Sequence, residues 1–135
     1  MGARRSRIKF TLVEPATYLV ENGEVYTIRP SAGKLVDEIK VDVYYKDVKI
    51  GKGVKVLVGT VARFWEWKVI EKNKTVHDLS EYVDKSGFKS VKDWIKAVIK
   101  VNRKVPLLLW LYHVKIEEFN GEKEELIKVL EVYEQ

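Results

Sequence analysis

The chain has 135 residues, 46% of them hydrophobic, which suits one domain with a sizeable buried core. It contains no cysteine, which excludes disulfide frameworks and sites built on thiolates. The formal net charge of +5 divides into +10 over residues 1–116 and −5 over residues 117–135, which indicates a polyanionic partner for the basic part.

The composition also bears on location. Lys and Glu are abundant and glutamine occurs only at Gln135, a bias that resembles thermophile proteins. No apolar run approaches the roughly 20 residues that cross a membrane, and the basic opening MGARRSRIKF lacks the apolar stretch of a secretory signal. We therefore expect a cytoplasmic protein with no membrane partner. A Lys-rich surface that serves only solubility is the alternative explanation of the charge.

The first elements predicted are a strand and a short helix. β-branched and aromatic residues predict a strand over residues 7–13. Pro15 suits the first turn of the helix that follows over residues 16–23, because its missing N–H has no partner there. Asn22 and Gly23 are typical of its end. A short extended run, residues 25–28, comes next.

Two longer segments then predict more of the sheet. Strict alternation of apolar and polar residues predicts a half-buried strand over residues 37–46. Residues 47–70 hold one or two further strands, with a turn or bulges marked by Gly51, Gly53 and Gly59.

The last third of the chain predicts helix, strand and helix. Thr75 or Asp78 can cap a short helical segment that ends at Tyr82, and residues 86–102 have the apolar spacing of a helix. Residues 107–119 read as a long central strand. Residues 117–135 contribute an acidic, amphipathic helix. The order predicts an α+β fold in a single domain, 1–135: a small, mostly antiparallel β-barrel with flanking helices and an extra C-terminal helix.

Metal and cofactor sites are poorly supported by the residues present. The two histidines, His77 and His113, lie far apart in the sequence, and no cysteine is available as a ligand. His113 alternates within the long apolar strand, which favours a hydrogen-bonded histidine of the core or its edge. We predict no metal and no cofactor.

Two segments carry the chemistry of nucleic-acid binding. In ARFWEWK, residues 62–68, Arg63, Trp65 and Trp67 share one face of a strand, and an arginine flanked by rings suits phosphate contact and base stacking. The alternative is that these rings belong to the core. In YTIRPSAGK, residues 26–34, a strand delivers Arg29 into a turn, where scaffolds commonly present binding groups. An ordinary surface charge is the alternative for Arg29.

With these segments in view, the chain resembles an ASCH domain of the PUA-like superfamily, from Ile8 to about Ile116. The resemblance is carried by the strand and helix ending in ENG, by YTIRP, by KLVDEIKVDVY, by KTVHDLSEYVDKSGFKSVKDWIK and by the long closing strand. It implies a PUA-like β-barrel with a cleft beside the first helix, lined by residues around the TIR element. The ligands that it implies are RNA or modified nucleosides.

Some relatives within this resemblance are amidohydrolases that act on N4-acetylcytidine. They use a Lys three residues before the Thr of the TIR element and a Glu near the SGF position. Here these positions hold Glu24 and Gly87, and neither can replace the side chain in question. We therefore assign no catalytic residue and favour a binding protein over an enzyme.

The prediction is an RNA-binding module with a basic, aromatic-lined cleft beside the TIR segment, whose partner is single-stranded or structured RNA or a nucleotide. The expected binding residues are Tyr26, Thr27, Arg29, Ser31, Lys34, Arg63, Trp65 and Lys89. Two alternatives stay open. One is a small hydrolase of amidohydrolase or ribonuclease type, acting on RNA or a modified nucleoside in the same cleft. The other is a protein-interaction module with weak self-association through the C-terminal helix.

Overall fold

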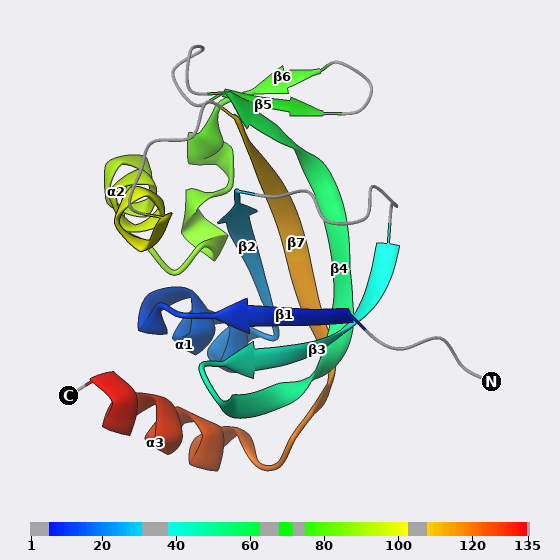
Figure 1. Cartoon of the computed structure of the whole chain (residues 1–135), viewed down its shortest axis with the longest axis vertical. Coiled ribbons are helices and arrows are strands. Elements are labelled where there is room, and N and C mark those ends of the chain that lie inside the picture. Colours follow the sequence, from blue (N-terminus) through cyan, green and yellow to red (C-terminus); the bar gives the residue numbers. More distant parts are fainter. Residues whose placement is uncertain (1–5, 31–37, 63–67, 72–74, 103–107, 135) are drawn as a thin grey trace.

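A computed structural model describes residues 6–30, 38–62, 68–71, 75–102 and 108–134 (Figure 1). Within these ranges the chain forms a mixed, mostly antiparallel sheet with three α-helices, which confirms the predicted α+β class. The elements in chain order are β1 (Ser6–Phe10), α1 (Val13–Asn22), β2 (Glu24–Arg29), β3 (Glu38–Tyr45), β4 (Val48–Ala62), β5 (Lys68–Glu71), β6 (Val76–His77), the 3-10 helices η2 (Leu79–Glu81) and η3 (Val83–Lys85), α2 (Val91–Asn102), β7 (Leu108–Phe119) and α3 (Lys123–Glu134).

The sheet is curled into a half-barrel around its longest strand, β4. The first part of β4 pairs with β3 and its last residues pair with β5, while its other edge pairs with β7. β1 adds to β3 in parallel, and β2 adds antiparallel to β7. Among the described residues, β1 and β2 are thus edge strands that do not pair with each other. We call the gap between these two edges the seam.

Two irregularities explain how so long a strand bends. The register of β4 against β7 shifts between Lys52 and Gly53 and again between Leu57 and Gly59, which confirms the predicted bulges. A bulge bends its strand and increases the local twist. At Gly53 the two backbones approach so closely that a Cβ atom would overlap the carbonyl oxygen of Lys115.

The first helix begins earlier than the sequence predicted. β1 ends at Phe10 rather than at residue 13, and α1 begins at Val13 rather than at residue 16. Pro15 still lies in the first turn, where no N–H is required. The helix ends as predicted, because Gly23 adopts a left-handed φ of 79° and donates its N–H to the Leu19 carbonyl at 2.7 Å.

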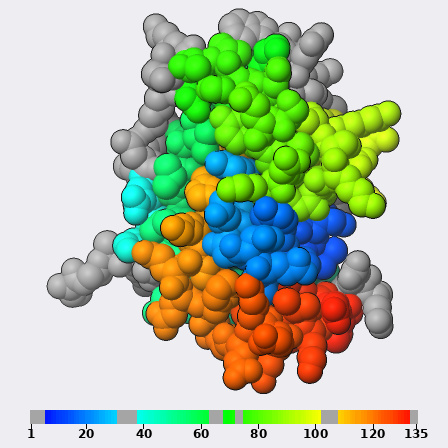
Figure 2. Space-filling model, turned by 180° about the vertical axis from the view of Figure 1, so that it is seen from behind, coloured from blue at the N-terminus to red at the C-terminus, as the bar shows by residue number. Residues whose placement is uncertain are grey.

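The hydrophobic core has two clusters. One lies between α1, α3 and the β1–β3 side of the sheet and includes Leu19 and Leu130. The other lies under α2 and includes Trp94 and Leu109. Figure 2 shows α2, α1 and α3 one below another on one face of the molecule. None of the helices in the described ranges is long and apolar enough to span a membrane.

Candidate functional site

β2 presents two of the predicted residues at one end of the seam. Its pairing with β7 places Thr27 opposite Tyr112 and Arg29 opposite Trp110. Because side chains alternate along a strand, Thr27 and Arg29 share one side of β2, and Tyr26 points to the other. The strand ends at Arg29, so its side chain lies at the junction between the sheet and the connection that follows.

The Arg29 side chain crosses the seam from β2 to β1. Its Nη1 donates a hydrogen bond to the main-chain oxygen of Lys9 at 2.7 Å, and its Cζ lies 4.7 Å from the centroid of the Phe10 ring. Its Nε is buried and has no hydrogen-bond partner among the described residues. Burial lowers the pKa of Arg29 to about 10, so the guanidinium still carries its charge at neutral pH.

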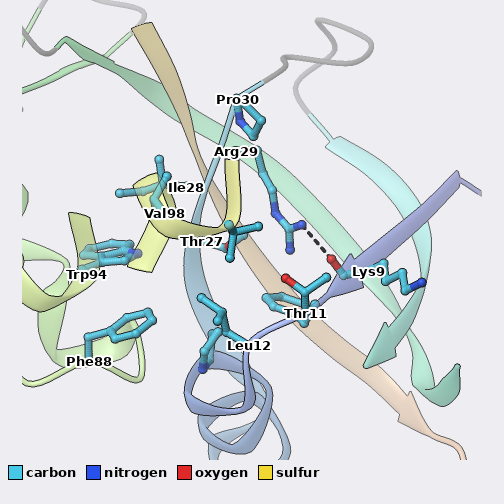
Figure 3. A pocket seen from close by; sticks show the side chains of 13 residues that line it. Lys9, Thr11, Leu12, Thr27, Ile28, Arg29, Pro30, Phe88, Trp94 and Val98 are labelled. Atoms are coloured by element: carbon cyan, nitrogen blue, oxygen red, sulfur yellow. Dashed lines mark hydrogen bonds between the residues drawn. The ribbon is translucent and has the colours of Figure 1, made fainter. Parts of the chain in front are cut away.

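A pocket of about 250 Å³ opens beside this guanidinium. It lies where the end of β1, the start of α1, the end of β2 and helix α2 meet (Figure 3). The side chain of Arg29 lies on one side of it, and Phe88, Trp94 and Val98 lie on the other. The hydroxyl-bearing Thr27 and Thr11 also line it. The lining residues are Lys9, Phe10, Thr11, Leu12, Pro15, Thr27, Ile28, Arg29, Pro30, Phe88, Trp94, Val98 and Val101.

The pocket therefore combines an apolar wall with a cationic one. None of the described residues that line it carries a carboxylate or an imidazole. Such a lining can hold a flat apolar group and an attached oxygen or anion. Beyond the lysine amine and the two hydroxyls, the described lining residues offer no group suited to general acid–base catalysis.

The other predicted residues lie elsewhere or outside the described ranges. Tyr26 is not among the residues that line the pocket, and its ring centroid lies 4.8 Å from that of His113 and 5.0 Å from that of Tyr82. Lys89 is exposed and lines a neighbouring hollow with Phe88. The remaining four, Ser31, Lys34, Arg63 and Trp65, lie outside the residues that the structure describes.

Several lining residues were not predicted as site residues. Trp94 and Val98 lie on the apolar face of the helix that the sequence predicted within residues 86–102, but that pattern does not say that the same face borders a pocket. Thr11 offered a signal, because its hydroxyl interrupts an apolar run at the junction of strand and helix. Lys9 contributes its carbonyl oxygen, which no side-chain pattern reports.

A polar network occupies the opposite face of β2. The Glu24 carboxylate contacts His113 Nε2 and accepts a hydrogen bond from Lys85 Nζ, each at 3.2 Å. These two hydrogen bonds lower the pKa of Glu24. His113 is half-buried and hydrogen-bonded, as the alternation of its strand indicated. Nearby, burial and the adjacent Glu71 carboxylate raise the pKa of Tyr82 to about 12.

Residue 87 has a structural reason to be glycine. Its φ is 90°, a left-handed value that side chains disfavour. A Cβ atom there would lie 2.5 Å from the carbonyl oxygen of Glu14. The segment before α2 can approach the start of α1 this closely only because Gly87 lacks a side chain. The backbone thus leaves no room for an acid at this position.

No group of three or more His, Asp or Glu side chains in the described part of the chain is arranged to hold a metal ion. No protein-family model, no curated protein and no solved structure matches the chain. The resemblance to ASCH domains accordingly depends on the sequence segments quoted above.

Proposed function

We propose that this protein binds RNA, or a nucleotide, in the pocket beside Arg29, in the manner of an ASCH domain of the PUA-like superfamily. The main observation behind the proposal concerns Arg29, whose buried Nε has no hydrogen-bond partner among the described residues. A buried donor without an acceptor costs about 1–3 kcal/mol, and more when it is charged. The Nε atom itself is enclosed, but Arg29 lines the pocket, so a ligand oxygen there would bind the accessible part of the guanidinium and stabilise its desolvated charge.

The opposite wall supports a base as the group that enters. The half-buried Phe88 offers apolar surface, and the buried Trp94 and Val98 also border the pocket. Base faces pack well on apolar surface of this kind. The Thr11 and Thr27 hydroxyls are able to donate to or accept from the polar edge of a base. The pocket is at the small end of ligand sites, which suits one unstacked base rather than a duplex.

The side chains that line the pocket favour ligand binding over catalysis of a reaction. A hydrolase acting on RNA or a modified nucleoside needs a group that accepts a proton from water. A carboxylate or imidazole is the usual choice, and neither lines the pocket within the described residues. Glu24 lies on the opposite face of β2, where His113 and Lys85 engage its carboxylate.

Fluorescence anisotropy with a labelled single-stranded RNA and a labelled hairpin tests the proposal. We expect binding at low salt that weakens as salt rises, with a log–log slope of about −0.7 per phosphate contact for the single strand. Arg29→Met should lower the affinity about tenfold, because a charge-assisted hydrogen bond is lost. Lys52→Met removes the same charge from an exposed position on β4 and should have only a small effect.

Two outcomes would overturn the proposal. One is the absence of binding to either RNA and to free nucleotides at low salt. The other is an equal loss of affinity in Arg29→Met and Lys52→Met, which would show that charge alone matters. Incubation with N4-acetylcytidine and with labelled RNA provides the enzymatic comparison. Release of acetate or cleavage of the strand, lost on Arg29→Met, would favour the hydrolase.

A further inference from the structure

A second pocket, of about 300 Å³, lies against the other side of Arg29. Its lining comes from β1, the end of β2, β4 and β7. It shares Lys9, Arg29 and Pro30 with the first pocket, so the two adjoin at the Arg29 side chain. Its cationic residues are Arg7, Lys9, Arg29 and Lys55, and no acidic residue lines it within the described part of the chain.

These cations contrast with several other lysines of the described sheet, which are paired with carboxylates. Elsewhere on the sheet, lysines form ion pairs: Lys40 with Glu117 at 3.2 Å, Lys49 with Asp42 at 3.8 Å and Lys68 with Asp78 at 2.6 Å. Among the described residues, none of the four pocket cations pairs with an acid.

Aromatic rings hold three of these cations instead. The Arg7 guanidinium lies 5.2 Å from the Tyr44 ring centroid, and the Lys55 ammonium lies 5.0 Å from that of Tyr112. Arg29 lies over Phe10. A ring fixes a cation in place through its quadrupole without neutralising the charge. The positive charges are therefore positioned in advance and remain available to an anion.

The closeness of these charges has a cost in the free protein. Partial burial lowers the pKa of Lys55, and the positive charge of Arg29 lowers it further. Like charges that repel one another across a pocket favour an anion between them. An anion bound there would relieve the repulsion and would also meet the donors of Arg29.

We propose that this second pocket binds a phosphate monoester, the terminal phosphate of the nucleotide whose base enters the first pocket; the inference rests on the proposed function. A monoester carries about −1.5 to −2 charge at neutral pH and three acceptor oxygens, which suits several cations better than a single carboxylate would. Guanidinium groups bind such oxygens in pairs. Arg29 would contact both parts of the ligand.

Isothermal titration calorimetry on the full chain tests this with four nucleoside 5′-monophosphates, the matching nucleosides and inorganic phosphate. We expect each monophosphate to bind at least about tenfold more tightly than its nucleoside, because charge-assisted hydrogen bonds are added. The advantage should shrink from pH 7 to pH 5, since the second phosphate pKa is about 6. RNA with a 5′-phosphate, compared with the same RNA ending in a hydroxyl, distinguishes a strand end from a free nucleotide.

Variants with a matched control test whether the tighter binding of monophosphates arises at the second pocket. Lys55→Met should remove most of the phosphate advantage while leaving nucleoside affinity unchanged. Arg7→Gln, at an exposed position, is the second variant in case Lys55→Met does not fold. Lys52→Met, on the same strand as Lys55 but outside this pocket, should retain the full advantage.

The possible results distinguish a failure of the phosphate site from a failure of the proposed function. Equal affinities for monophosphates and nucleosides would overturn the phosphate site and leave the proposed function standing. So would a loss in Lys52→Met equal to that in Lys55→Met. Binding of inorganic phosphate that depends on Lys55, without any binding of nucleoside or RNA, would instead overturn the proposed function and the nucleotide part of this inference.

Discussion

Two charged residues of β2, Glu24 and Arg29, lie in opposite electrostatic surroundings. Glu24 is compensated on its face of the strand by His113 and Lys85. Arg29, on the other face, contacts a carbonyl oxygen and a ring and has no carboxylate partner within the described residues. A compensated charge contributes modestly to stability, whereas a buried charge without a counter-ion reduces it. The difference suggests a structural role for Glu24 and a ligand-binding role for Arg29.

Replacing Arg29 with methionine should therefore separate stability from binding. Methionine keeps much of the side-chain volume over Phe10 and removes a charged group whose burial lowers its pKa. We expect the free energy of unfolding to stay the same or to rise by about 1–2 kcal/mol. Urea denaturation measures it. A loss of more than about 1 kcal/mol would contradict the prediction and make Arg29 a structural residue.

Replacing Glu24 with glutamine should affect stability only above acidic pH. The fold lowers the pKa of Glu24, so its ionised form stabilises the protein above its ordinary pKa of 4.5. That contribution is lost as the pH falls through the folded-state pKa. Because the side chain is partly exposed, we expect the variant to be less stable by at most about 1 kcal/mol at pH 7. At pH 3 the difference should be smaller. Urea denaturation at both values checks this, and an equal difference at both would contradict it.

At the scale of elements, the close packing of β4 on β7 shapes the half-barrel. The bulges near Gly53 and Gly59 let β4 bend while it pairs with β3 and β5 on one edge and with β7 on the other. The same bend brings Lys55 and Tyr112 to the pocket that Arg29 also lines. The bulges thus contribute to the candidate site as well as to the shape of the sheet.

Gly53→Ala should destabilise the protein through this contact. The new Cβ would overlap the carbonyl oxygen of Lys115, and backbone in a paired strand cannot move aside as a side chain can. We expect the midpoint of urea denaturation to fall, with a loss of about 2 kcal/mol or more. Lys52→Ala, the exposed neighbour, is the control and should change stability by less than about 0.5 kcal/mol. Similar losses of stability in the two variants would show that the overlap with the Lys115 carbonyl does not explain the effect.

At the scale of the whole molecule, the acidic C-terminal helix completes one of the two hydrophobic clusters. α3 places Leu126 and Leu130 against α1, and the Lys123 ammonium donates to the main-chain oxygen of Glu21 at 2.7 Å. In Figure 1, α3 lies at the end of the molecule away from β5 and β6. The acidic C-terminal helix and part of the basic region thus share one of the two hydrophobic clusters.

Leu130→Ala tests the contribution of α3 to stability. Leu130 is 2% exposed, and its truncation leaves a cavity between α3 and α1. The expected loss is about 2–4 kcal/mol, seen as a lower melting temperature in circular dichroism. Val132→Ala on the same helix, where the side chain is 71% exposed, should leave the melting temperature nearly unchanged. Comparable losses in both would mean that Val132 is covered in solution.

Much of the fold could be predicted from the sequence because its signals are local. The alternation over β3, the apolar face of α2 and the glycine at the end of α1 each depend on residues within a few turns or one strand. The start of α1 was missed by three residues, because Pro15 is compatible with any position in the first turn. The opposite placement of Tyr26 and Thr27 was derivable in principle from the period of two in a strand.

By itself, the sequence determined the order of the three α-helices and the longer strands, the apolar faces that pack and the excess of positive charge in the first 116 residues. Only the tertiary structure decided which charges face one another. Arg29 reaches Lys9 across the seam, and Lys55 joins it because β4 pairs with β7, so residues distant in the chain share a pocket. Local patterns report which side chains are buried, whereas strand register and sheet curvature set the distances between elements, and these depend on packing throughout the molecule.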